Sequence, residues 1–278
     1  MNRTIGWVLL VVILIGGAVA YYYWRQNLQQ PVPPPLAHPT APPAPLSTGP
    51  RHPLETGAAQ PLPVLGESDA AMSEALAGLK RPPRTLVCAS AIGYYGDRGD
   101  EVLREESPPG AGFLAEVCRE WEAAARPAAE KGIRVVQLRI GVVLSAAGGA
   151  LALMLTPFKL GLGGRVGTGQ QYMSWIALDD LAGIIQHALA NESLRGPVNA
   201  VAPRAITNRE FTKTLGRVLG RPTIFPMPAF AARLAFGQMA DELLLASARV
   251  EPTRLIASGY KFRTPELEAA LRHLLGKT

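Results

Sequence analysis

The stretch Thr85–Gly96 reads TLVCASAIGYYG and decides the fold class. Its first five residues are β-branched or apolar, which is typical of a strand buried on both faces of a parallel sheet. Ser90 follows at the carboxyl end of this strand, where open α/β sheets bind their ligands. Tyr94 and Tyr95 come next, in a loop. The pattern allows two interpretations: a ligand site, or a serine that caps backbone groups beside tyrosines that pack in the core.

Strand and helix patterns alternate downstream of this stretch. Strands are expected at Thr85–Ala89, Ile133–Ile140 and Pro197–Ala202, and helices at Gly112–Lys131, Ala150–Leu160 (broken at Pro157) and Leu178–Ala190. Phe113, Val117, Trp121 and Ala124 form the expected buried stripe of the first helix. This alternation predicts an α/β layer fold with right-handed crossovers. A capping box at Thr207–Glu210 is expected to open a helix that ends at Gly220.

The amino terminus has a different composition. Ile5–Trp24 reads IGWVLLVVILIGGAVAYYYW and carries no charged residue. At about 1.5 Å per residue it would span roughly 30 Å, the thickness of a bilayer core. We expect a single-pass membrane anchor whose amino terminus is cytoplasmic, because Arg3 and the terminal amine outweigh Arg25. The alternative is a signal peptide cleaved near Ala20, followed by export.

A proline-rich stretch from Pro31 to Pro63 follows, and it favours an extended, disordered linker because proline lacks a backbone N–H. The expected segments are the anchor over residues 1–30, the linker over 31–65, a short helix over 66–80, an α/β part over 81–203 and a helical carboxyl-terminal domain over 204–278.

Composition excludes several classes of function. Hydrophobic residues make up 48% of the chain, which is enough to bury a core. The net charge is +6, and the basic residues after Arg204 alternate with apolar ones at helical spacing, which indicates solvated helix faces rather than a nucleic-acid surface. The two cysteines and four histidines show no metal-ligand spacing, so no metal site is expected.

A glycine-rich stretch and an acidic pair could also carry chemistry. Gly161–Gly169 reads GLGGRVGTG, but a helix pattern precedes it and a strand follows, the reverse of a dinucleotide-binding turn. We therefore expect a flexible loop at the edge of a cleft. Asp179 and Asp180 in SWIALDDLA could act as acid and base, but aspartates at a helix start more often cap it.

Several ordered motifs in residues 81–278 resemble the epimerase-like family of the extended short-chain dehydrogenase/reductase superfamily. They are SAIGYYGDRGDE at Ser90–Glu101, the Trp121–Glu122 helix, LRIGVVLSAAGGALA at Leu138–Ala152, PFKLGLGG, SWIALDDLA and GPVNAVAP at Gly196–Pro203. The tail from Arg217 resembles that family's carboxyl-terminal domain of unknown function. Residues 1–79, through LGESD at Leu65–Asp69, resemble the amino terminus of a bacterial membrane-anchored family of unknown function.

The resemblance implies a Rossmann-type fold and NAD(P) as cofactor. It places Ser90 or Ala91 at the catalytic Ser/Thr position, and Tyr95 is a further catalytic candidate nearby. It also implies that Ile140, Gly141 and Val142 form the loop that approaches the nicotinamide. On the substrate side it implies Arg139, Trp175, Asp180 and Asn199.

Two departures from the family's pattern limit this implication. Phe113/Val117 or Leu114/Cys118 stand where the superfamily has its Tyr-x-x-x-Lys pair. The family's first strands and glycine turn have no counterpart, so we expect a partial Rossmann-like fold in which Thr85–Ala89 has an exposed edge.

We therefore expect an NAD(P)-dependent epimerase or oxidoreductase-family protein that is inactive or incomplete. One alternative is a non-catalytic, membrane-anchored interaction module that binds a protein partner, or itself, at the exposed sheet edge. The other is a gene-fusion product without evolved function.

Overall fold

The computed structural model describes residues 64–237 and 239–277, and residues 61–278 form one compact unit. The helices are α2 Val64–Ala77, α3 Phe113–Ala124, α4 Arg126–Glu130, α5 Gly149–Lys159, α6 Leu178–Ala190, α7 Asn208–Leu219, α8 Ala229–Phe236, α9 Thr253–Ala257 and α10 Leu267–Leu274. The strands are β1 Thr85–Ala91, β2 Val102–Leu103, β3 Arg134–Ile140, β4 Val142–Leu144, β5 Tyr172–Met173, β6 Trp175–Ala177, β7 Gly196–Ala200, β8 Ile206–Thr207 and β9 Arg249–Val250. A 3₁₀ turn η1 covers Ile92–Tyr95 and a π-helix η2 covers Ala240–Leu245.

The main sheet is parallel and has the order β1-β3-β7. The three strands that the sequence predicts are these three, with ends shifted by one or two residues. Their register aligns Ser90 with Arg139, and Arg139 with Asn199. Three residues far apart in sequence therefore lie in one row near the carboxyl ends of the strands, with side chains on the same face.

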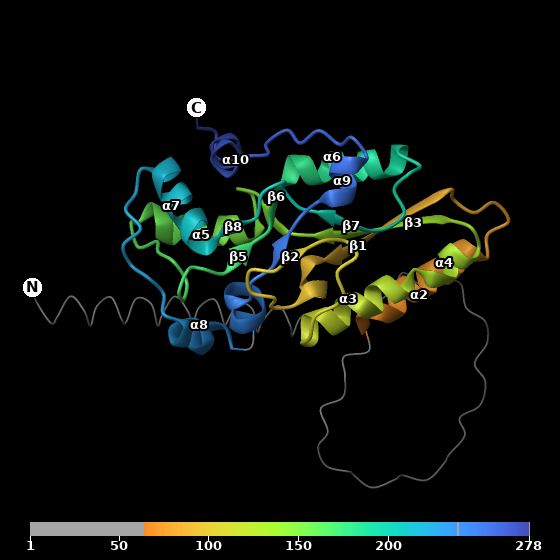
Figure 1. Cartoon of the computed structure of the whole chain (residues 1–278), viewed down its shortest axis with the longest axis horizontal. Coiled ribbons are helices and arrows are strands. Elements are labelled where there is room, and N and C mark those ends of the chain that lie inside the picture. The colour runs from red at the N-terminus through yellow and green to blue at the C-terminus, as the bar shows by residue number, and fades with distance from the viewer. Residues whose placement is uncertain (1–63, 238, 278) are drawn as a thin grey trace, which may run out of the picture. The chain divides into compact units, whose positions relative to one another are not determined.

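Helices cover both faces of this sheet (Figure 1). On one face, Val136 and Leu138 of β3 pack with Ile184 of α6 and Leu255 of α9. On the other face lie α3 and α4, and α2 packs beside them. These layers are those of the α/β class that the alternating pattern predicts.

Helix α2 belongs to the same packed unit as the sheet. Leu76 packs against the buried cluster of Ala125, Ala128, Ile133 and Val135, as does Leu86 of β1. The Ser73 hydroxyl accepts a hydrogen bond of 3.1 Å from the backbone N–H of Ala128. The short helix expected before Arg81 is therefore present and fixed against the layer formed by α3 and α4.

A second core lies under the carboxyl-terminal helices. Trp175 of β6, Leu151 of α5, Phe211 of α7 and Leu271 of α10 are buried together. The capping box forms as expected, with the Thr207 hydroxyl accepting from the Glu210 N–H at 3.2 Å. Gly220 ends α7 with a φ of 64°, the left-handed region that favours glycine.

Two local expectations are wrong. Pro157 does not break its helix: α5 continues to Lys159, with the proline in its last turn at the cost of one backbone N–H donor. The glycine stretch is held in place: Gly167 N–H donates to the Met227 carbonyl at 2.8 Å, and Met227 N–H donates to the Arg165 carbonyl at 2.8 Å. It lies between α5 and β5, as its flanking patterns predict.

The expected membrane localisation is corrected. Over residues 64–237 and 239–277, no helix combines the length and the apolar character needed to cross a bilayer. The predicted anchor at Ile5–Trp24 and most of the predicted linker lie outside the described residues. We withdraw the membrane localisation on this finding.

Candidate functional site

The guanidinium of Arg139 is the centre of a buried polar cluster. Arg139 is on β3 and is 2% exposed. Its Nε and Nη2 atoms lie 2.8 and 2.9 Å from the two carboxylate oxygens of Glu122, which α3 places above the strand. This paired geometry is the strongest form of ion pair between these residue types. The bond fixes α3 over the end of the sheet.

The remaining contacts of Arg139 are with the loop after β1. Its Nη1 donates to the Tyr95 hydroxyl at 2.9 Å and to the Glu105 carbonyl at 3.1 Å. Its Cζ lies 3.5 Å from the centre of the Tyr94 ring, which is a cation–π contact. Burial lowers the pKa of Arg139, but hydrogen bonds to Glu122 and Tyr95 outweigh burial and raise it above its ordinary value. The guanidinium is charged, and four of its five N–H donors are bonded to protein groups.

Tyr95 connects this cluster to β7. Its side chain is fully buried, and its hydroxyl lies 2.7 Å from Asn199 Oδ1. Burial raises the pKa of Tyr95, so the hydroxyl stays protonated at neutral pH. The amide nitrogen of Asn199 donates to the Glu251 carbonyl at 2.9 Å. Asn199 therefore joins the sheet to the carboxyl-terminal segment.

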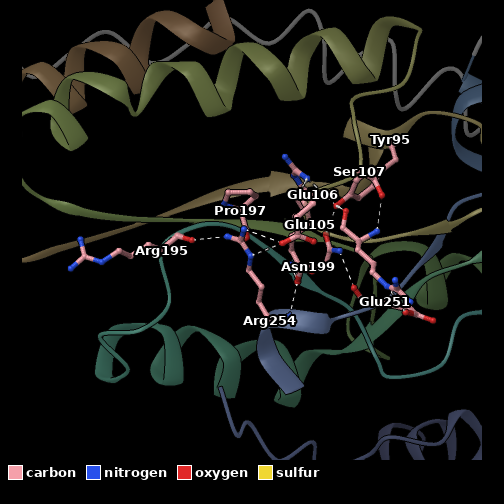
Figure 2. Close-up of polar contacts among 11 residues, drawn as sticks. Tyr95, Glu105, Glu106, Ser107, Arg195, Pro197, Asn199, Glu251 and Arg254 are labelled. Atoms are coloured by element: carbon pink, nitrogen blue, oxygen red, sulfur yellow. Dashed lines mark hydrogen bonds and ion pairs between the residues drawn. The ribbon is translucent and has the colours of Figure 1, made fainter. Parts of the chain in front are cut away.

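Glu105 forms the second half of the cluster (Figure 2). Its Oε1 accepts from the backbone N–H groups of Asn199 and Arg254, at 3.1 and 3.2 Å. Its Oε2 is buried without a hydrogen-bond partner among the described residues. Burial raises the pKa of Glu105 despite the two backbone donors. The Arg254 side chain also donates to two carbonyls at 2.9 and 3.0 Å. They belong to Arg195, which directly precedes β7, and to Pro197, the second residue of β7.

Four of the predicted site residues meet in this cluster, namely Ser90, Tyr95, Arg139 and Asn199. Ser90 is 4% exposed and donates to Glu122 Oε1 at 2.9 Å. Each of the four is bonded to other protein groups. Their burial favours a positioning role over direct contact with a substrate.

Trp175 and Asp180 lie elsewhere. Trp175 is in the core under α5, α7 and α10. The Asp180 carboxylate accepts from the N–H groups of Arg263 and Thr264 at 2.7 and 3.0 Å, and from the Thr264 hydroxyl at 2.9 Å. The structure therefore gives Asp180 a role in holding the segment before α10, apart from the Arg139 cluster.

The predicted nicotinamide loop, Ile140–Val142, is the bend between β3 and β4. Gly141 approaches β6 so closely that a Cβ there would lie 2.6 Å from the Ser174 carbonyl oxygen. Glycine is required at this position for packing alone. Its contact with a nicotinamide stays a prediction.

No acid–base pair stands at the end of β1 among the described residues. Leu114 and Cys118 of α3 face that end, since a Cβ on Gly93 would lie 3.2 Å from Leu114 Cβ and 3.7 Å from Cys118 Sγ. Burial raises the pKa of the Cys118 thiol, which keeps it neutral. The amino terminus of α3 is occupied as well, because the Leu114 N–H donates to Glu242 Oε2 at 2.9 Å.

The glycine stretch does not fit a diphosphate. A Cβ on Gly164 would lie 1.8 Å from the Phe225 carbonyl oxygen, and one on Gly163 would overlap the Phe158 ring at 2.6 Å. The space beside these glycines is thus filled by the chain itself. Over the described residues, glycines precede a helix at Gly110–Gly112 before α3 and at Gly148–Gly149 at the start of α5. Neither pair directly follows a strand with the G-x-G-x-x-G spacing of a dinucleotide-binding turn.

Sequence and structure comparisons decide the family. Residues 227–274 match the model of a domain of unknown function, DUF1731. The chain is 40% identical over 210 residues to the human epimerase family protein SDR39U1, covering 75% of this chain and 71% of that protein. The chain belongs to this epimerase family. An epimerase family protein of Mycobacterium bovis is 49% identical over 187 residues, covering 67% of this chain and 62% of the relative.

A solved structure supports the same assignment. The crystal structure of the human epimerase family protein with NADPH has a TM-score of 0.73 and 38% identity, covering 77% of this chain and 72% of that one. By sequence, the chain spans 62% of the length of its Mycobacterium bovis relative. A chloroplastic homologue from Arabidopsis thaliana, 44% identical, extends the epimerase family beyond bacteria.

The comparisons confirm two predictions and leave others open. The epimerase family and its carboxyl-terminal domain are confirmed, and so is the Rossmann-like α/β class. The resemblance of residues 1–79 to a bacterial membrane-anchored family is without support. Sequence reasoning missed Glu105, Glu251 and Arg254, whose contacts are all with residues distant in sequence; Glu122 was noted only as part of a motif.

Proposed function

We propose that the described residues form the nicotinamide-side and substrate-side half of an NAD(P)-dependent epimerase-like protein. The observation that carries this proposal is the row of Ser90, Arg139 and Asn199 across the carboxyl ends of β1, β3 and β7. Ligands of open α/β sheets bind at that end. The NADPH named with the human relative's structure adds support from the family.

We propose further that this chain alone does not turn over NAD(P). The described residues contain no G-x-G-x-x-G turn directly after a strand, and Leu114 and Cys118 face the end of β1 where an acid–base pair would act. Except for Glu105 Oε2, the side-chain groups described for the Arg139 cluster are bonded to protein partners, so the cluster orients the strand ends rather than transferring protons. The substrate is left open by this arrangement.

A titration of the purified full chain with NADPH tests the proposal. Because the described residues contain no G-x-G-x-x-G turn to receive the diphosphate, we expect no saturable binding below about 1 mM, a limit that corresponds to roughly −4 kcal/mol. Nicotinamide fluorescence and calorimetry measure it. The human relative whose structure contains NADPH serves as the positive control. Micromolar, one-to-one binding by this chain would contradict the proposal.

The edge of β1 favours a second candidate function, an interaction module. Over the described residues β1 pairs with β3 alone. The Arg134 N–H donates to the Arg84 carbonyl, so that carbonyl points toward β3. The Thr85 N–H belongs to the same peptide unit as the Arg84 carbonyl and therefore points the opposite way, away from β3. Because directions alternate along a strand, the N–H groups of Val87 and Ala89 also point away from β3. We propose that a strand of another polypeptide pairs with this edge of β1.

A proline substitution tests that second function. Val87→Pro removes an outward N–H without touching the β3 ladder, whereas Cys88→Pro removes an inward one and controls for loss of fold. Light scattering after size exclusion measures association. If the wild-type chain is a well-folded monomer that retains no partner strand, the interaction module is wrong.

A further inference from the structure

A groove of about 550 Å³ lies between α3–α4 and the strands β3 and β7. Its floor includes Ala125, Ile133 and Val135, all buried. Arg119 of α3, Arg126 of α4 and Arg195 before β7 line its walls, together with Tyr94, Glu122 and Gln137. The groove is thus an apolar surface surrounded by three cations from three different elements.

The three guanidinium groups have no counter-charge of their own. Over the described residues, none of the Arg119, Arg126 and Arg195 side chains has an ion pair or a side-chain hydrogen bond. Glu122 is the one carboxylate in the lining, and Arg139 already pairs with both of its oxygens. The groove therefore has a positive potential, which attracts anions.

The backbone that presents these arginines is held firmly. The carbonyl of Leu194 accepts from Arg134 Nη1 at 2.9 Å, and that of Arg195 accepts from Arg254 Nη1 at 2.9 Å. Gln137 is fixed as well, because its Nε2 donates to the Glu122 carbonyl at 2.6 Å. That bond leaves the Gln137 amide oxygen as an acceptor at the groove. A binding site held in this way loses little entropy when a ligand binds.

We propose that this groove, which adjoins the Arg139 cluster through Tyr94 and Glu122, is a second binding site for a phosphate-bearing ligand with a flat ring. Arginine binds phosphate through paired N–H donors, which matches the three free guanidinium groups. The apolar floor covers one face of a ring, and the Gln137 amide oxygen accepts from an amino group on it. This combination is the chemistry of a nucleoside monophosphate. The proposal does not depend on NAD(P) binding.

Calorimetry with the full chain and three probes tests the site: AMP, inorganic phosphate and adenosine. We expect AMP to bind at least about tenfold more tightly than either phosphate or adenosine. Only AMP has both a phosphate for the arginines of the walls and a ring for the apolar floor. Binding of AMP should weaken as salt rises. Equal binding of AMP and phosphate overturns the proposal, and so does the absence of AMP binding.

Charge-removing variants make the test specific. Arg126→Ala and Arg195→Ala should each weaken AMP binding about tenfold, whereas Arg263→Ala removes the same charge far from the lining residues and should leave it unchanged. Unfolding temperatures identify any variant that fails to fold. Equal loss in all three variants would mean attraction by net charge alone, which overturns the site.

Discussion

At the scale of single residues, the ion pair of Arg139 with Glu122 is the buried interaction on which the site depends. The Arg139 side chain is 3% exposed and that of Glu122 is 13% exposed, so the pair is largely removed from water. Charges in such a place depend on each other, because a partner removed leaves the other buried and unpaired. The arginine was predicted from the family's substrate-side motif, but its bonds show a group that holds the structure together.

Glu122→Ala should therefore lower the free energy of unfolding by about 3 kcal/mol, since it leaves the Arg139 guanidinium buried without its carboxylate. Chemical denaturation measures the change. In a double-mutant cycle, the variant with both Arg139→Met and Glu122→Leu should lose clearly less stability than the sum of the losses of Arg139→Met alone and Glu122→Leu alone. Strictly additive losses would show that the two side chains do not act as a pair.

Glu105 predicts a pH dependence of stability. Burial raises its pKa above the ordinary value of 4.5, so its stabilising, protonated form is complete below that value and is lost as pH rises through the folded-state pKa. Compared with Glu105→Gln, which cannot ionise, the wild-type chain should lose stability as the pH rises above 4.5, the ordinary pKa of a glutamate. Denaturation at several pH values measures both chains. A constant difference between them would contradict the prediction.

At the scale of elements, α3 shows how a tertiary contact overrides a local pattern. The stripe predicted to be buried begins with Phe113, yet Phe113 is 53% exposed, and Ala115 and Cys118 are buried instead. The close approach of Gly93 brings this second stripe against the end of β1. A charged residue, Glu122, lies one turn after Cys118 on the buried side, where the ion pair with Arg139 replaces apolar packing.

The bend between β3 and β4 gives a prediction for a glycine. Gly141→Ala should destabilise the chain by about 2 kcal/mol or more, because a Cβ would lie 2.6 Å from the Ser174 carbonyl oxygen and 2.8 Å from Val201 Cγ1. Gly148→Ala is the matched control, since nothing lies within 4 Å of a Cβ there. Thermal unfolding compares the two. Similar effects for both variants would refute the packing role of Gly141.

At the scale of the whole molecule, the carboxyl-terminal segment completes the cluster at the end of the sheet. Glu242 binds the amino terminus of α3, Glu251 accepts from Asn199, and the Arg254 N–H donates to Glu105. Strand β9 also pairs with β2. These contacts make the segment part of the same folded unit, although a family model treats residues 227–274 as a domain.

Residues 61–278 should consequently unfold in one cooperative step. Fluorescence of Trp121 and Trp175 reports the α3 layer and the core under α10, while far-ultraviolet circular dichroism reports all helices. We expect the denaturation midpoints by the two methods to coincide. Two separated transitions would show that the carboxyl-terminal part folds independently.

The sequence alone determined the α/β class, the strands β1, β3 and β7, helix α6 and the capping box of α7. Each of these depends on composition and periodicity over neighbouring residues, which act locally. The family also followed from sequence, through ordered motifs along one half of the chain. The predicted edge position of Thr85–Ala89 agrees with the described sheet, where β1 is an end strand.

Only the tertiary structure decided which polar residues meet. Glu105 and Arg254 are 149 positions apart in the chain, and Tyr95 and Asn199 are 104 apart. No periodic pattern encodes such pairs, because the register of parallel strands and the docking of the carboxyl-terminal segment bring them together. Tertiary contacts also place Asp180 apart from the cluster. Its carboxylate accepts hydrogen bonds from the backbone N–H groups of Arg263 and Thr264, and sequence motifs do not reveal this pairing.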